Sequence, residues 1–179
     1  MIRITYFVHG TTTDNEKEVS SGCHDVDLSD LGVKQSIDLR DDVKDKHYDV
    51  VFCSDLIRSV HSAEITFGDR VKIIQDTRLK ECDYGEYNAK PSAIVEPMQE
   101  VNITKRFPSG ESYEDVKLRI DDFLKYLKTN YEGKSVAIVA HKAPQLALDV
   151  LLGGKTWKQA FADDWRKRKA WQPGWEYIL

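Results

Sequence analysis

Two apolar stretches of this chain, far apart in the sequence, each run directly into a histidine. The first, Ile2 to Val8, is rich in β-branched and aromatic residues and precedes His9, and the second, Ser135 to Ala140, precedes His141. Both stretches are typical of buried strands. In a parallel sheet the carboxyl ends of the strands lie at one edge, where open α/β sheets bind ligands. The sequence therefore predicts that the two imidazoles converge on one site.

The rest of the pattern indicates strands that alternate with helices. Short apolar runs at residues 49–53 and 71–74 predict two further strands. Helices are expected from Ser29 towards Lys44, from about Asp55 with Ser54 as its N-cap, from the capping box Ser112–Asp115, and through Leu146 to Leu151 until Gly153 and Gly154. This alternation predicts a three-layer α/β/α fold with a mostly parallel central sheet.

Length and composition are typical of one globular domain, and we expect residues 1–179 to form it. The net charge of -4 argues against a nucleic-acid partner. No apolar stretch approaches the roughly 20 residues that cross a bilayer, so no membrane partner is expected. Three cysteines without C-x-x-C spacing favour reduced thiols and a cytoplasmic location. The sequence leaves open whether the protein forms a homodimer.

A series of motifs in consistent order resembles the histidine phosphatase superfamily, also called the phosphoglycerate mutase-like family. The matching segments are His9-Gly10 followed by Asn15, Gly22 to Gln35, Ser54 to Ala63, Leu79 to Gly85, Pro108 to Ser112, and the strand that ends at His141. The resemblance covers residues 2 to about 150 and implies a phosphoglycerate mutase-like fold.

The resemblance also implies a chemistry and assigns roles to the motif residues. His9 would attack phosphorus as a neutral imidazole and form a phosphohistidine. Glu81 would protonate the leaving oxygen and later take a proton from water. The other substrate-contacting residues implied are Arg58, whose planar fork suits phosphoryl oxygens, with His141, Asn15 and Gly22. This chemistry requires no metal and no cofactor.

The resemblance therefore favours a metal-independent phosphomonoesterase that acts on a small phosphorylated metabolite. The alternative is a phosphate-binding or regulatory protein of the same fold with reduced or lost catalysis. Val8 favours the alternative, because the opening motif of the family has an arginine at this position. Losing one such preorganised donor costs about 3 kcal/mol of transition-state stabilisation in other enzymes. Lys142, where relatives have a small residue, either restores the missing charge or points to solvent.

Two further segments carry expectations. Residues 86–108 are expected to form a lid over the leaving group. Near the C-terminus, the spacing of Trp157, Phe161 and Trp165 predicts one packing face of a helix. The basic residues 166–169 that interleave with these aromatics are solvated or, alternatively, contact an anionic substrate. The terminal residues 175–179 are expected to add an edge strand.

Overall fold

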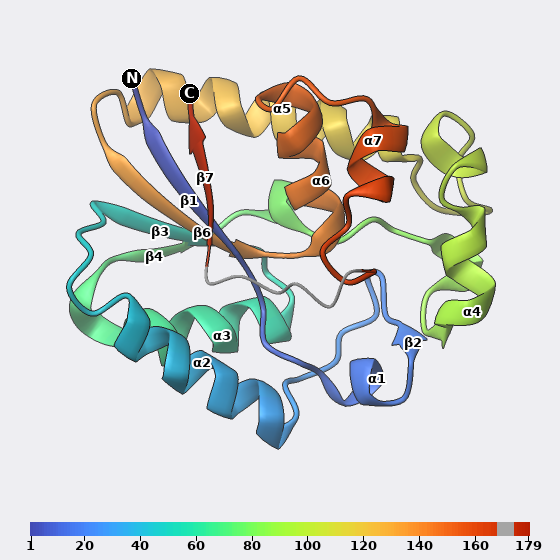
Figure 1. Ribbon diagram of the computed structural model, residues 1–179, viewed down its shortest axis with the longest axis horizontal. Coiled ribbons are helices and arrows are strands. Elements are labelled where there is room, and N and C mark those ends of the chain that lie inside the picture. Colours follow the sequence, from blue (N-terminus) through green and yellow to red (C-terminus); the bar gives the residue numbers. More distant parts are fainter. Residues whose placement is uncertain (168–173) are drawn as a thin grey trace.

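The central sheet has strand order β4-β3-β6-β1-β7 in the computed structural model, which describes residues 1–167 and 174–179 (Figure 1). Its strands are β1 (Arg3–Val8), β3 (Val50–Cys53), β4 (Ile73–Gln75), β6 (Ser135–Ala140) and β7 (Trp175–Ile178). The first four pair in parallel, whereas β7 pairs antiparallel with β1 at the sheet edge. The predicted mostly parallel sheet and the C-terminal edge strand are both confirmed.

Helices cover both faces of this sheet, which confirms the three-layer architecture (Figure 1). One face packs against α2 (Asp30–Asp42) and α3 (Ile57–Phe67). The opposite face packs against α5 (Tyr113–Asn130), α6 (Lys142–Leu151) and α7 (Trp157–Ala162). No helix in the described parts of the chain is long and apolar enough to cross a bilayer.

Period-two alternation along each strand builds the two cores. In β3, Val50 and Phe52 face the core beneath α5 and α6, whereas Val51 and Cys53 face α2 and α3. All four side chains are buried, as expected for a parallel sheet that is covered on both faces. Phe52 packs edge-on against Phe123 of α5, with ring centroids 5.2 Å apart. The apolar runs of the sequence are therefore continuous because both faces need apolar side chains.

The predicted helix starts are confirmed except for one. The Ser29 side chain caps α2, and Ser112 with Asp115 forms the capping box of α5. The expectation that Ser54 caps the next helix is wrong, because α3 begins at Ile57 and its N-cap is Leu56, which makes no side-chain cap bond. Residues 54–56 separate β3 from α3 and bend at Asp55 and Leu56. The Ser54 Oγ accepts from the Leu56 amide at 3.3 Å and lies 2.6 Å from His141 Nε2.

Short elements connect these layers and form one side of the site. The loop after β1 contains α1 (Thr13–Glu16) and β2 (Val19–Ser20), and β2 pairs antiparallel with β5 (Lys90–Pro91). The expected lid segment contains, besides β5, α4 (Ser92–Val95) and the 3-10 helices η4 (Glu96–Met98) and η5 (Val101–Ile103). The remaining 3-10 helices are η1 (Gly68–Arg70), η2 (Thr77–Leu79) and η3 (Gly85–Tyr87).

The C-terminal segment corrects the predicted helical face. Trp157 and Phe161 stack on each other, with ring centroids 5.7 Å apart, and both pack against Tyr113 of α5. Helix α7 ends at Ala162, however, so Trp165 lies beyond the helix and packs near Trp175, 6.1 Å between ring centroids. Residues 168 and 169 of the basic cluster lie outside the described residues.

Candidate active site

The structure brings together the two histidines that follow strands β1 and β6. These strands are paired neighbours, with Val8 opposite Ala140 in the register. The His9 amide donates to the Ala140 carbonyl at 3.0 Å, and the two imidazole centroids are 5.0 Å apart. The parallel pairing of β1 and β6 therefore brings the two imidazoles together, as predicted.

The hydrogen bonds of His9 define which ring nitrogen is available. Its Nδ1 lies 2.7 Å from the Gly10 carbonyl oxygen, which can only accept, so the proton is on Nδ1. The lone pair of the neutral ring is then on Nε2. Burial and the nearby positive charge of Arg58 lower the pKa of His9 to about 3. His9 is thus neutral near pH 7, as a nucleophile must be.

His141 is held by its backbone and by one edge of its ring. The Tyr6 hydroxyl donates to the His141 carbonyl at 2.6 Å and accepts from the His141 amide at 2.9 Å. Ser54 Oγ lies 2.6 Å from Nε2, whereas Nδ1 is buried and has no hydrogen-bond partner among the described residues. Burial and Arg58 lower the pKa of His141 well below its usual value. If the Ser54 hydroxyl donates to Nε2, the unpartnered Nδ1 carries the ring proton.

Arg58 lies in the first turn of α3 and is only 2% exposed. Its Nη2 donates to the Gly22 carbonyl at 2.6 Å and its Nη1 to the His24 carbonyl at 2.9 Å. Gly22, predicted to bind substrate, does not line the pocket described below, and neither do the fully buried Arg58 and His141. It adopts a positive φ of 56°, and a Cβ there would meet Asn88 Oδ1 at 2.0 Å. The glycine lets this loop turn and present its carbonyl to Arg58.

Glu81 reaches the site from a loop, and the start of α6 holds its carboxylate. Oε1 accepts from the Cys82 amide at 2.8 Å and the Ala143 amide at 3.0 Å, and Oε2 accepts from the Lys142 amide at 3.2 Å. The first amides of a helix have no partner within the helix and attract negative groups. Since α6 begins directly after His141, this contact places Glu81 beside the histidines.

A pocket of about 690 Å³ opens at this edge of the sheet, within the range of small-molecule sites. Its walls include His9, Asn15 and Glu81, together with Gln35, Tyr84, Ser92, Ala93 and Glu96. Ser92, Ala93 and Glu96 of the expected lid thus form part of the wall. Asn15 Oδ1 accepts from the Thr12 amide at 3.0 Å, which leaves the amide Nδ2 of Asn15 as a donor.

Val8 and Lys142 line the same pocket. Lys142 does not point to solvent, because its side chain is only 6% exposed. Its Nζ lies 3.6 Å from Asp164 Oδ2, and burial and the charge of Arg166 lower its pKa to about 8. A buried ammonium is therefore present in the pocket in which Val8 stands at the position of the family arginine.

Several contacts of the site could not be read from local sequence. Trp165 and Arg166 reach the pocket wall from the C-terminal segment, where Arg166 pairs with Glu96 at 2.9 Å and Asp164 at 3.3 Å. The only signal for them is the aromatic and basic composition of this segment. Nothing in the local sequence around Ser54 or Tyr6 indicates their contacts with His141, because both depend on distant strands. Among residues 1–167 and 174–179, no group of three or more metal-ligating side chains could hold an ion.

Comparisons with known proteins agree with this geometry. The family model of the histidine phosphatase superfamily (branch 1) matches residues 6–171. Phosphoserine phosphatase 1 of Hydrogenobacter thermophilus is 27% identical over 165 residues, which are 86% of this chain and 77% of the relative. A putative phosphoserine phosphatase 2 of the same organism is 30% identical over 164 residues, 86% of this chain and 80% of the relative.

Solved structures show the same fold. The alpha-ribazole phosphatase of Shigella flexneri superimposes with a TM-score of 0.78 at 22% sequence identity, covering 89% of this chain and 84% of that one. Family model, curated relatives and fold all agree with the motif resemblance. The chain belongs to the histidine phosphatase superfamily, branch 1.

Proposed function

We propose that this protein is a metal-independent phosphomonoesterase that acts on a small phosphorylated metabolite through a phosphohistidine intermediate. The observation that carries the proposal is the state of His9. Its Nδ1 lies 2.7 Å from the Gly10 carbonyl oxygen, it lines the pocket together with Glu81, and burial and Arg58 lower its pKa, which favours the neutral ring. A preoriented imidazole beside a carboxyl group is the pairing that covalent phosphoryl transfer requires.

In the first step, His9 Nε2 attacks phosphorus, and the N–P bond forms while the P–O bond to the leaving group breaks. Glu81 gives its proton to the departing oxygen, so that an alcohol leaves rather than an alkoxide. Arg58, Nδ1–H of His141 and the Asn15 amide donate hydrogen bonds to the non-bridging oxygens. These donors stabilise the negative charge on the phosphoryl oxygens in the transition state.

In the second step, water attacks the phosphohistidine and the N–P bond breaks. Glu81, now a carboxylate, takes the proton of the attacking water. Inorganic phosphate leaves, and His9 returns to its neutral state. Neither step needs a metal ion.

The size of the pocket and the names of the relatives support the substrate class. A pocket of about 690 Å³ suits a metabolite rather than a phosphoprotein surface. Relatives are named as phosphatases of phosphoserine, fructose 2,6-bisphosphate and alpha-ribazole compounds. We infer from these names that the substrate of this chain is likewise a small phosphate ester.

Trapping the intermediate tests this proposal. The protein is mixed with p-nitrophenyl phosphate and quenched within milliseconds in alkaline denaturant, because the phosphohistidine N–P bond survives alkali and hydrolyses in acid. We expect intact-mass and peptide analysis to show one phosphoryl group, located on His9. Turnover without any phosphoenzyme in the pre-steady state would contradict the covalent mechanism.

A second candidate function is phosphate recognition without efficient catalysis, and Val8 is the observation that favours it. The pocket wall carries Val8 where the family has an arginine, and loss of one such donor costs about 3 kcal/mol elsewhere. A recognition protein would bind inorganic phosphate in calorimetry but show neither a phosphoenzyme nor turnover. The trapping experiment and calorimetry together separate the two functions.

We further propose that Lys142 supplies the charge that Val8 lacks, which predicts a non-additive pair of substitutions. Lys142→Ala lowers kcat/KM by up to about a hundredfold. Adding Val8→Arg to this variant restores part of the loss, whereas Val8→Arg in the wild type helps less, because two cations then serve one dianion. Steady-state kinetics of the four proteins check this, with Lys128→Ala as the exposed-lysine control. Additive effects would contradict compensation by Lys142.

The same role predicts a limb in the pH profile. Lys142 faces Arg166 and Asp164 of the C-terminal segment, Glu81 of the loop before η3, and Glu96 of η4. Burial and Arg166 outweigh the three carboxylates and lower the pKa to about 8. The ammonium is present below that pH and lost above it, so wild-type kcat/KM, which reports the free enzyme, falls above pH 8. In Lys142→Ala, this fall of kcat/KM above pH 8 should be absent.

A further inference from the structure

Glu81 lies in a stretch without regular secondary structure, between the end of η2 at Leu79 and the start of η3 at Gly85. A proton donor must stay within hydrogen-bond reach of the leaving oxygen. Groups on loops hold such a position less well than groups on helices or strands, unless neighbouring side chains support them. The contacts around Glu81 therefore decide how well its carboxyl group is held in position.

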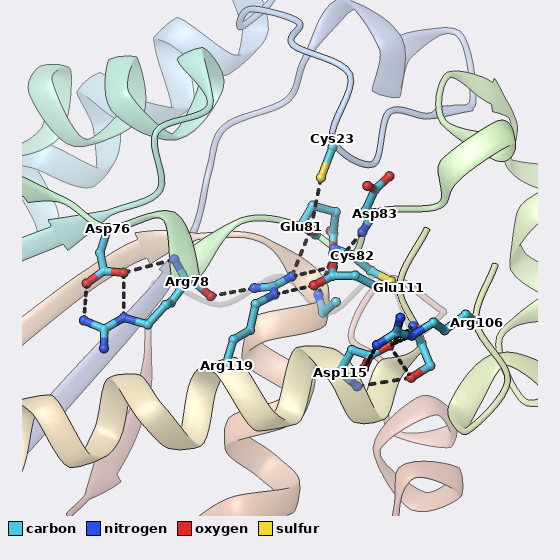
Figure 2. A network of polar contacts seen from close by, with 12 residues as sticks. Cys23, Asp76, Arg78, Glu81, Cys82, Asp83, Arg106, Glu111, Asp115 and Arg119 are labelled. Atoms are coloured by element: carbon cyan, nitrogen blue, oxygen red, sulfur yellow. Dashed lines mark hydrogen bonds and ion pairs between the residues drawn. The ribbon is translucent and has the colours of Figure 1, made fainter. Parts of the chain in front are cut away.

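Arg119 of α5 binds the backbone of Glu81 and also that of η2, which precedes this stretch (Figure 2). Its Nη1 donates to the Arg78 carbonyl at 2.5 Å, and its Nη2 donates to the Glu81 carbonyl at 3.1 Å. The Cys23 thiol adds a weaker contact to the Glu81 carbonyl at 3.5 Å. One guanidinium thus connects the backbone of the loop to a long helix of the fold.

Glu111 orients this guanidinium and also binds the loop beyond Glu81 (Figure 2). The Arg119 Nε and Nη2 donate to Glu111 Oε1 at 2.9 Å and Oε2 at 3.0 Å, a bidentate pair that is largely buried. The Asp83 amide donates to Glu111 Oε2 at 3.0 Å, and the Glu111 amide donates to the Asp83 carbonyl at 2.8 Å. The backbone is therefore anchored on both sides of Glu81.

From these contacts we propose that Arg119, oriented by Glu111, is a positioning residue for the proton donor Glu81. Arg119 fixes the backbone of Glu81 from α5, Glu111, just before α5, fixes the backbone of Asp83, and the first amides of α6 fix the Glu81 carboxylate. Together these two anchors set the distance from the carboxylate to the leaving oxygen. The inference rests on the proposed function, in which Glu81 is the acid.

The geometry requires the arginine fork rather than a positive charge alone. Arg119 serves one carboxylate and two carbonyls at the same time, with donors that are fixed in one plane. A lysine keeps the charge and one contact to Glu111 but cannot reproduce this set. Arg119→Lys therefore preserves the charge balance of the buried pair while releasing the Glu81 backbone.

The test compares kcat/KM for phosphate esters whose leaving groups differ in basicity, from p-nitrophenyl phosphate to phenyl phosphate and an alkyl phosphate. For Arg119→Lys we expect a loss of up to about a hundredfold on the alkyl ester, since misplacing a catalytic group by 1 Å has that cost elsewhere. On p-nitrophenyl phosphate the loss should stay within about threefold, because this leaving group needs little protonation. Glu111→Gln, a second variant, should likewise lose more activity on the alkyl ester than on p-nitrophenyl phosphate.

Arg106→Lys is the matched control. Arg106 also makes a bidentate pair, with Asp115, and its exposed side chain makes no hydrogen bond to Arg119 or to the Glu81 backbone among the described residues. This variant should show no dependence of its effect on the leaving group. Circular dichroism and thermal midpoints report the folded fraction of every variant.

The outcomes separate the inference from the function on which it rests. A steeper leaving-group dependence in Arg119→Lys and Glu111→Gln, but not in Arg106→Lys, supports positioning. Equal losses on all esters in folded Arg119→Lys, with a steep dependence in Glu81→Gln, overturn the positioning role and leave the proposed function in place. Equal losses in Glu81→Gln itself contradict the acid role of Glu81 and, with it, both proposals.

Discussion

Replacing His9 with alanine lowers turnover by at least about 10³-fold and abolishes the phosphoenzyme, since loss of a covalent nucleophile elsewhere costs up to about 10⁶. The reason is that no other described side chain offers a lone pair at the same place. His141 is oriented by Tyr6 and Ser54, and its ring centroid lies 5.0 Å from that of His9. The measurement is kcat on p-nitrophenyl phosphate together with rapid-quench trapping.

His47→Ala is the matched control for this variant. His47 carries the same ring on an exposed side chain, 83% accessible, whose nearest carboxylate, Asp49, is 3.9 Å away. Its removal should leave both turnover and phosphoenzyme unchanged. Phosphate release by folded His9→Ala at a rate near that of the wild type would show that His9 is not the nucleophile.

Replacing Glu81 with glutamine produces the second large effect, and this effect depends on the substrate. General acid catalysis contributes about 10²–10⁴-fold, and Gln cannot supply the proton. We expect a loss of this size on alkyl phosphates and a loss of only a few-fold on p-nitrophenyl phosphate, whose leaving oxygen departs without protonation. The comparison is made as kcat/KM, which includes the step in which the leaving group departs.

Glu86→Gln serves as the control, because Glu86 is an exposed carboxylate five residues further along the chain and does not line the pocket. It should be active on every ester. Losses of similar size on alkyl and aryl esters in Glu81→Gln would argue that Glu81 holds the site together rather than donates a proton.

Most of the fold could be predicted because the deciding signals are local. The apolar runs that became β1, β3 and β6 are continuous because both sheet faces are buried, and Ser29 and Ser112 cap helices through bonds to residues three positions away. Ser54 shows where such reasoning fails. Its type suits an N-cap, and its hydroxyl does accept from the Leu56 amide, but the helix begins only at Ile57 and the same hydroxyl bonds His141, 87 residues away.

In the candidate site too, some features could be predicted from the sequence and others could not. The placement of His9 and His141 follows from the rule that parallel strands end at one edge, so the sequence predicts it. The sequence does not show that Arg58 binds two carbonyls of the loop between β2 and α2, or that Glu81 caps α6. These contacts depend on how a loop packs against a helix, and no periodicity encodes that.

By itself, the sequence determined the five strands of the central sheet and most of the helix starts, because each depends on neighbours within a few positions, and its motifs singled out the candidate site residues. Only the tertiary structure decided that Lys142 is buried in the pocket, that Trp165 and Arg166 form part of its wall, and that Arg119 anchors the loop of Glu81. Each of these contacts joins residues separated by tens of positions. Such a contact stabilises the protein only after the layers have packed and water has left the space between them.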